Sequence, residues 1–405
     1  MMGSRASPSL PLMTSSTTQS DWPSAGPLRC PECWTAFLPP PQNEHDMTTA
    51  KPHASNNFDF VRLSAASLVI VGHAYPLLAH PDLPHFLHTS ISTYAVKVFF
   101  ALSGFLIVAS WTHDPHARRF LFKRVLRIFP ALILVVLLAA FVLGPLVTRL
   151  PLGEYFGHSM FGDYFLNMRL YIAYSLPGVF ETNTYPNAVN GSLWSLPAEF
   201  FMYLLVLACG LAARWLRVVG FAVVWGGLTL VFMALNMAEI HFQTGYFTGA
   251  VVYATPVTSV IEVAPYFMIG GCIQLARRWL PLSPVVALVA MAGAVGIAQA
   301  GIYAEPLFIL ITSYSVIALG STSTPVLRDF GRFGDLSYGT YLYGFPVAQT
   351  LSWAFGDRLP FVGHILLALA ISLLLAFASW HMVEKRAMKI KPKAQAGTMP
   401  RPQAV

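Results

Sequence analysis

The sequence predicts an all-α, polytopic membrane protein, a helix bundle of about ten transmembrane helices with both termini in the cytoplasm. Of its 405 residues, 55% are hydrophobic and only 11% are charged. Soluble domains carry about 25% charged residues, so much of this surface is expected to face lipid. Apolar runs of about 20 residues, the length that crosses a bilayer, recur along the chain. Lysines and arginines gather in short clusters between those runs, as topology signals do.

Ten apolar segments have roughly the length needed to span a membrane. Their approximate bounds are 59–79, 93–111, 121–147, 193–212, 218–237, 251–275, 282–300, 305–322, 334–354 and 361–383. The third segment is long enough to tilt or to extend beyond the bilayer. The stretch 148–192 mixes aromatic residues with Gly, Pro and Asn, and we expect it to lie along the outer interface, where aromatic belts form.

The basic clusters assign the two sides of the membrane. One side holds Arg118, Arg119, Lys123, Arg124, Arg127, Arg214, Arg217, Arg277, Arg278, Arg328, Arg332, Lys385, Arg386, Lys389, Lys391 and Lys393. The opposite loops hold Arg149, Arg169 and Arg358, with Lys97 at a helix mouth. By the positive-inside rule both termini are cytoplasmic, and an even number of spans agrees with this because it puts both termini on the same side. The net charge of +7 therefore reflects topology, and no nucleic-acid partner is predicted.

We expect one membrane domain, residues 58–390, between two tails. Residues 1–57 are rich in Pro, Ser and Thr, lack periodicity and lack the apolar core of a signal peptide, so a disordered tail is predicted. Met47 is an alternative start for the chain. Residues 391–405 form a basic cytoplasmic tail. Cys30 and Cys33 make one CxxC with no second pair at zinc spacing, so neither a metal site nor a disulfide framework is predicted.

The first apolar segment carries an ionisable pair. Arg62 and His73 are eleven residues apart, so both fall on one helix face, about 16 Å apart along the axis. Ionisable residues inside membrane helices usually face the bundle interior and indicate a functional site. In the alternative interpretation, Arg62 snorkels to the interface and a neighbouring helix satisfies His73. Asp59 lies one turn before Arg62 and can pair with it.

Two further motifs have a structural and a functional interpretation. Phe99–Ile107, FFALSGFLI, contains Ser103 and Gly104, small residues that let membrane helices approach closely. Packing is the favoured interpretation of this motif alone. Arg124 and Arg127 are three residues apart on one helix face and form a fork of guanidinium groups suited to phosphates. On charge alone, an anchor to lipid headgroups is the better explanation.

Glu199 is carried into the bilayer by Asn190–Leu205, NGSLWSLPAEFFMYLL. A carboxylate there costs a few kcal/mol unless it is paired, so it should have a partner. Glu199 and His73 each lie about six residues, roughly 9 Å, below the outer ends of their segments. We therefore expect Glu199 to orient the His73 ring and to stabilise its protonated form. Glu262, near the middle of the sixth segment, is expected to be protonated or paired within the bundle, in a structural role.

Taken together, these motifs resemble the acyltransferase 3 family of integral-membrane O-acyltransferases. The resemblance runs from Asn57 to Arg386 and rests on FDFVRLSA with His73, VFFALSGFLI, RVLRIFP and NGSLWSLPAEFFMY, in this order. Members of this family acylate bacterial surface polysaccharides, nodulation factors and some macrolides. The stretch Gly334–Pro346 also looks familial, but many members carry a histidine where this chain has Gly344. No catalytic role is assigned to that stretch.

The resemblance implies roles for the site residues. His73 corresponds to the catalytic histidine and Arg62 to its partner arginine, while Arg124 and Arg127 correspond to the pair that engages acyl-CoA. Ser103 is expected at the same donor site, and Glu199 matches the acidic position of the WSL segment.

The implied reaction uses acyl-CoA, most often acetyl-CoA, as a co-substrate bound from the cytoplasm. His73 would act as general base on a hydroxyl of a surface or lipid-linked glycan, and no bound cofactor or metal is expected. Arg62 would bind the donor or stabilise developing charge. The implied location is the bacterial inner membrane, in contact with its lipids. Open alternatives are a succinyl or longer acyl group, a macrolide or lipid acceptor, or a secondary transporter.

Overall fold

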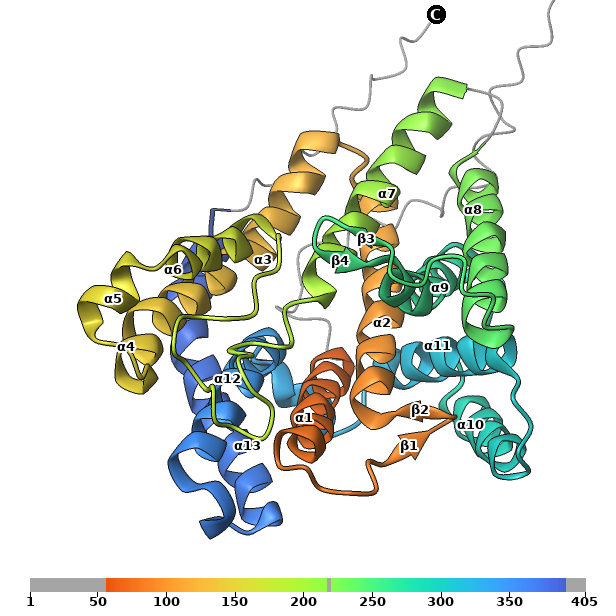
Figure 1. Cartoon of the computed structure of the whole chain (residues 1–405). Coiled ribbons are helices and arrows are strands. Elements are labelled where there is room, and N and C mark those ends of the chain that lie inside the picture. Colours follow the sequence, from red (N-terminus) through yellow and green to blue (C-terminus); the bar gives the residue numbers. More distant parts are fainter. Residues whose placement is uncertain (1–55, 217–219, 391–405) are drawn as a thin grey trace, which may run out of the picture. The chain divides into compact units, whose positions relative to one another are not determined.

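The computed structural model describes residues 56–216 and 220–390, and these are mostly helical with very little sheet (Figure 1). The strands within these ranges form two short antiparallel hairpins, β1 (His85–Phe86) with β2 (Thr89–Ser90) and β3 (Val251–Val252) with β4 (Thr255–Pro256). The predicted all-α fold is confirmed. The predicted tails at 1–55 and 391–405, with Met47, Cys30 and Cys33, lie outside the described residues.

Each of the ten predicted segments contains a helix, and short 3-10 and π-helical turns (η) extend or link several of them. The helical elements in order are α1 (Phe58–Leu77), α2 (Ile91–His113), α3 (Ala117–Leu138), η3 (Ala139–Leu143), α4 (Gly144–Val147), α5 (Leu152–Gly157), α6 (Ser159–Tyr164), η4 (Phe165–Arg169), α7 (Ser195–Leu216), α8 (Phe221–Asn236), η5 (Met237–His241), α9 (Val257–Ala276), α10 (Pro284–Gln299), α11 (Glu305–Ser321), η6 (Leu327–Phe333), α12 (Ser337–Phe355), η7 (Gly356–Arg358), α13 (Phe361–Ser379), η8 (Trp380–Glu384) and α14 (Lys385–Met388).

Seven helical stretches among the described residues are long and apolar enough to cross a membrane, which makes this a multi-pass membrane protein. They are Phe58–Leu77, Ile91–His113, Ala117–Val147, Ser195–Arg214, Phe221–Ile240, Val257–Ala276 and Phe361–Met388. The apolar helices α10 and α11 are shorter. Helix α12 is buried almost throughout, which lets it carry polar residues such as Thr340 and Gln349 inside the bundle.

Helix α2 packs against α1 on one side and α9 on another. A Cβ at Gly104 would overlap the carbonyl oxygen of Phe267 in α9, and one at Gly270 would overlap that of Ala101 in α2. The backbones of these helices therefore touch, as small residues allow in membrane bundles. The packing role predicted for the FFALSGFLI motif is confirmed.

Helices α1 and α2 are antiparallel, which fixes the depth of each residue on α1. The rings of Phe58 and Phe105 lie 5.9 Å apart at one end of this pair, and Gly72 packs against Ser92 at the other. Helix α12 covers another face of α1, where Gly344 packs against Ile70. A Cβ at Gly344 would lie 2.6 Å from Ile70 Cγ1, so this position has no room for a side chain.

Candidate functional site

A cavity of about 250 Å³ lies among α1, α2, α3, α7 and α12. The structure brings five of the six predicted site residues to its wall, and His73 is the exception. The five are Arg62, Ser103, Arg124, Arg127 and Glu199. Because these residues come from four helices that are far apart in the sequence, the cavity gathers most of the polar chemistry that the motifs predicted. We call it the donor cavity below, after the donor site that the resemblance implies for these residues.

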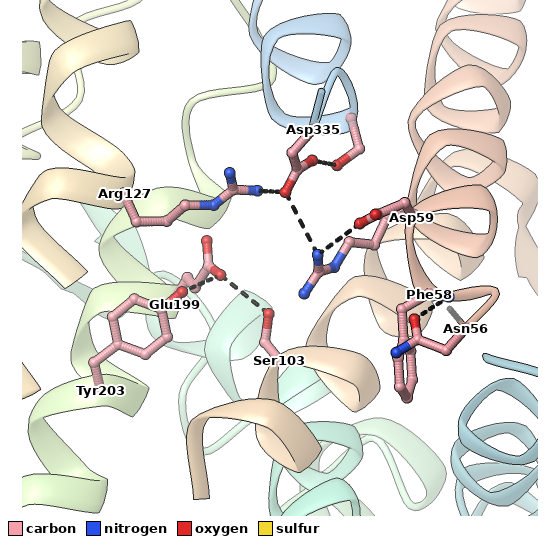
Figure 2. Close-up of polar contacts among 10 residues, drawn as sticks. Asn56, Phe58, Asp59, Ser103, Arg127, Glu199, Tyr203 and Asp335 are labelled. Carbon is pink, nitrogen blue, oxygen red and sulfur yellow. Dashed lines mark hydrogen bonds and ion pairs between the residues drawn. The ribbon is translucent and has the colours of Figure 1, made fainter. Parts of the chain in front are cut away.

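Asp335, in the turn before α12, holds two of the cavity's arginines together (Figure 2). Its Oδ2 lies 2.7 Å from Arg127 Nη2 and 3.5 Å from Arg62 Nη1. Ser337 Oγ donates a hydrogen bond of 2.7 Å to the other carboxylate oxygen. Arg62 also lies 3.5 Å from Asp59, so the predicted pair of these residues is confirmed. One carboxylate thus fixes the guanidinium groups of two different helices.

Arg124 is the arginine of the cavity that forms no ion pair with a carboxylate among the described residues. Its Nη2 donates to Ser110 Oγ at 3.2 Å, and its Nε is buried without a hydrogen-bond partner in the part of the chain that the structure describes. The guanidinium lies 5.6 Å from the ring centre of Phe120 and 5.8 Å from that of Tyr203. A partly buried cation without a counterion is costly, and phosphate oxygens are groups that guanidinium binds well.

Glu199 accepts hydrogen bonds from Ser103 Oγ at 3.1 Å and from the hydroxyl of Tyr203, one turn further along α7 (Figure 2). The predicted contact between Glu199 and His73 is therefore wrong. His73 Nδ1 is buried with no hydrogen-bond partner among the described residues, and its ring packs edge-on against Phe345 with centroids 5.2 Å apart. The two residues do not share a depth: Gly72, next to His73, packs on Ser92 of α2, whereas Glu199 bonds to Ser103, eleven residues or about 16 Å further along the same helix.

His73 lies about one helical turn beyond the donor cavity. Its neighbour Gly72 packs on Ser92 of α2, whereas the cavity extends along α2 only as far as Val96. The four residues from Ser92 to Val96 correspond to about 6 Å along α2.

Tyr341 lies on the side of the donor cavity that faces His73. It lines the cavity, and Phe345 follows it by one turn of α12 and contacts His73. The Tyr341 hydroxyl donates to the carbonyl oxygen of Ser192 at 2.7 Å and lies 2.6 Å from Ser195 Oγ. These two contacts pin the ring of Tyr341 between α12 and the start of α7.

The opposite end of the cavity borders the junction of α2 and α3. Lys123, on the cavity wall, lies 2.9 Å from one oxygen of Asp114, and Arg119 lies 2.6 Å from the other. The hydrogen bonds from Arg119 and then Lys123 lower the pKa of Asp114 to about 2. This cluster ties the end of α2 to the first turns of α3, the helix that carries Arg124 and Arg127.

Comparisons with known proteins agree with the motifs. An acyltransferase-domain family model matches residues 55–381, most of the chain. The chain belongs to the acyltransferase 3 family. It is 29% identical over 338 residues to an O-acetyl transferase of Shigella phage Sf6, covering 82% of this chain and 96% of that protein. It is also 29% identical over 380 residues to nodulation protein 10 of Rhizobium leguminosarum bv. viciae, covering 87% of this chain and 96% of that protein. No solved structure matches significantly.

The family and the fold make this chain a membrane-spanning O-acyltransferase, which excludes the secondary transporter as an alternative. The acyltransferase has three functional candidates that sequence reasoning missed. Tyr203 looked like one more apolar position of a membrane helix, and Tyr341 lies in a stretch to which no role was assigned. Asp335 could have been found, because a carboxylate directly before a membrane segment needs a partner.

Glu262 of the acyltransferase is paired within the bundle, one of its two predicted states. Lys97 Nζ lies 3.2 Å from Glu262 and 3.5 Å from Glu305, and Tyr266 donates to Glu305 at 3.3 Å. Lys97 was placed at a helix mouth, but its side chain is only 3% exposed, so it lies inside the bundle. Two carboxylates compensate this buried ammonium, which supports the structural role predicted for Glu262.

Proposed function

We propose that this acyltransferase transfers an acetyl group from cytoplasmic acetyl-CoA to a hydroxyl of a surface or lipid-linked glycan in the bacterial inner membrane. The observation that carries the proposal is the Arg124 guanidinium, which faces the donor cavity without a carboxylate partner. A CoA phosphate at this position would supply the missing negative charge.

The other cavity arginines complete the donor site. Arg62 and Arg127 share Asp335, and Arg62 also lies 3.5 Å from Asp59, so two carboxylates hold these two guanidinium groups at the cavity wall. In this proposal Arg62 binds the donor. It does not stabilise the charge that develops at the thioester carbonyl, because helix geometry puts it about 16 Å from His73 along α1. Ser103 and Tyr203 are held against Glu199, which gives the cavity wall a fixed set of hydroxyl groups for the donor's polar arm.

His73 is the proposed general base. Its imidazole takes the proton of the acceptor hydroxyl while that oxygen attacks the thioester carbonyl carbon. The carbon–sulfur bond of the tetrahedral intermediate then breaks, and the imidazolium returns the proton to the departing CoA thiolate. Since His73 Nδ1 has no hydrogen-bond partner and Glu199 does not contact the ring, the imidazole acts without a carboxylate orienter.

The thioester has to pass Tyr341 to reach His73. On α12, Tyr341 is the last residue that lines the donor cavity, and the next turn carries Phe345, which contacts the imidazole. The proposal therefore includes a rotation of the Tyr341 side chain that breaks its contacts with Ser192 and Ser195 when the donor binds. Lid-like side-chain and loop movements of this kind accompany substrate binding in many enzymes.

The test uses purified protein in lipid nanodiscs with radiolabelled acetyl-CoA and cell-envelope glycans. Label should move to the glycan with the wild type, and His73→Ala should lower the rate by a factor of about 10² or more, the usual contribution of a general base. His80→Ala, which changes an exposed histidine beyond the end of α1, is the matched control and should retain full activity. Unchanged transfer by well-folded His73→Ala protein would remove this residue from the mechanism.

A further inference from the structure

Helix α7 separates the donor cavity from a second, larger hollow. Its residues Ser195, Glu199 and Tyr203 line the donor cavity, whereas Ala198 and Leu204 face an apolar groove of about 580 Å³. The other walls of this groove come from α3, α8, α9 and the β3–β4 hairpin. The spacing of four residues places the first set on one face of α7, and the second set occupies the other.

The groove is open to the lipid along part of α7. Phe201 is 46% exposed and Leu204 is 41% exposed, although both belong to a helix that is apolar enough to span a membrane. The α7 wall runs from Pro197 to Leu204, a depth of about 10 Å. A hydrocarbon chain is the ligand that matches an apolar lining reached from the bilayer.

A single cation stands at the rim of the groove. Arg169, at the end of η4, is the one charged residue among the described residues that line it. Its backbone carbonyl accepts a hydrogen bond of 2.8 Å from the Tyr253 hydroxyl, and the Tyr253 ring packs on Tyr171 with centroids 5.4 Å apart. These contacts fix the β3–β4 hairpin beside Arg169. The arginine side chain itself is exposed and forms no ion pair with a described residue.

The position of Arg169 is unusual for a topology signal. The sequence puts it on the side of the membrane where arginine and lysine are scarce, so the positive-inside rule gives no reason for it. A guanidinium at the interface beside an apolar groove is complementary to a molecule with a hydrocarbon chain and an anionic phosphate.

We propose that the groove binds the lipid anchor of the acceptor, a single-chain lipid phosphate whose chain lies along α7 and whose phosphate contacts Arg169. This inference rests on the proposed function, which makes the acceptor a glycan, and it assigns that glycan to the lipid-linked class. The anchor would hold the acceptor across α7 from the donor cavity, so that the glycan is retained at the membrane surface while it reacts.

Binding is tested by native mass spectrometry of the full-length protein with farnesyl phosphate as the probe. We expect one bound farnesyl phosphate, retained in the presence of equimolar phosphatidylglycerol. Arg169→Gln should weaken binding about tenfold, which corresponds to about 1.4 kcal/mol. The control Arg358→Gln removes another exposed arginine of the same side and should bind as the wild type does.

A second pair of variants tests the groove itself. Leu204→Trp fills it and should abolish binding, whereas Leu211→Trp, on an exposed position two turns further along α7, should leave binding unchanged. Equal displacement by phosphatidylglycerol, or equal binding by Leu204→Trp and Leu211→Trp, would overturn the proposal.

Acyl transfer separates this inference from the proposed function. With a lipid-linked glycan as acceptor, Arg169→Gln should raise the acceptor KM about tenfold and leave the acetyl-CoA KM unchanged. With the same glycan released from its lipid, the variant and the wild type should have equal acceptor KM values. Wild-type transfer that is equally fast to both glycans, with no effect of Arg169→Gln, contradicts the anchor site but leaves the enzyme intact. Saturable binding of farnesyl phosphate without any acetyl transfer would instead contradict the proposed function alone.

Discussion

Two arginines one turn apart show how neighbours decide the role of a charged residue. Arg127 lies 2.7 Å from Asp335 and is compensated within the protein, whereas Arg124 has only the Ser110 hydroxyl and two aromatic faces. The sequence predicts the two guanidinium groups as an equivalent fork, because both lie on the same face of α3. The structure separates them, since the partner of Arg127 comes from a residue more than 200 positions later in the chain. Arg124 is therefore the residue on which donor affinity should depend most.

Replacing Arg124 by Gln should raise the KM for acetyl-CoA about tenfold to a hundredfold, because charge-assisted hydrogen bonds contribute about 1.5–3 kcal/mol. Thermal stability should change little, since no ion pair of the folded protein is lost. Arg118→Gln, which removes an exposed arginine from the same helix, serves as the control in the same steady-state assay. Equal KM values for the two variants would argue against Arg124 as the donor contact.

Asp335→Asn should destabilise the protein by about 2–3 kcal/mol, because it leaves Arg62 and Arg127 without their shared carboxylate. The carboxylate side chain is 17% exposed, which puts the effect below that of a fully buried pair. Thermal unfolding in detergent measures the change. The control Asp329→Asn affects a carboxylate that is 55% exposed and 3.9 Å from Arg328, so its unfolding temperature should match the wild type. Equal unfolding temperatures for the two variants would show that Asp335 does not hold the arginines.

At the scale of elements, the donor cavity depends on the junction between α2 and α3. Asp114 accepts hydrogen bonds from Arg119 and Lys123 in the first turns of α3, and this fixes the helix from which Arg124 projects. Glycine contacts fix α2 against α9 in turn. The motif residues are therefore carried by helices whose relative positions are set by close backbone packing and by one ion cluster.

This junction predicts a pH dependence of stability. The pKa of Asp114 is lowered from 3.8 to about 2 in the folded protein, so its hydrogen bonds contribute fully above about pH 4. That contribution is lost as the pH falls from about 4 to about 2, where the folded-state carboxylate becomes protonated. Unfolding temperatures of the wild type and Asp114→Asn should therefore converge over this range. A constant difference between them across the range would show that Asp114 is not stabilised as an anion.

For the whole molecule, composition and the recurrence of apolar segments predicted the all-α bundle, whereas the residues that gather at the donor cavity were assigned through the resemblance of their motifs to a family. The length of an apolar segment depends on the local sequence alone, so it does not require knowledge of the fold. The partner of Glu199 could not be predicted in this way, because counting residues from the ends of apolar segments does not fix how far each helix is shifted along its axis relative to its neighbours. Asp335 and Tyr341 were missed for a related reason: their contacts with Arg127 and Ser195 join segments that no spacing rule connects.

The central claim is that a donor bound at the Arg124 end of the bundle serves a base near the opposite end. Sealed inside-out vesicles test it, with radiolabelled acetyl-CoA outside and glycan enclosed. The account predicts that label reaches the enclosed glycan with wild-type protein and with His80→Ala, and that His73→Ala lowers the rate by a factor of about 10² or more. Transfer that requires acetyl-CoA and glycan on the same side of the membrane, or that proceeds unchanged without the His73 imidazole, would contradict it.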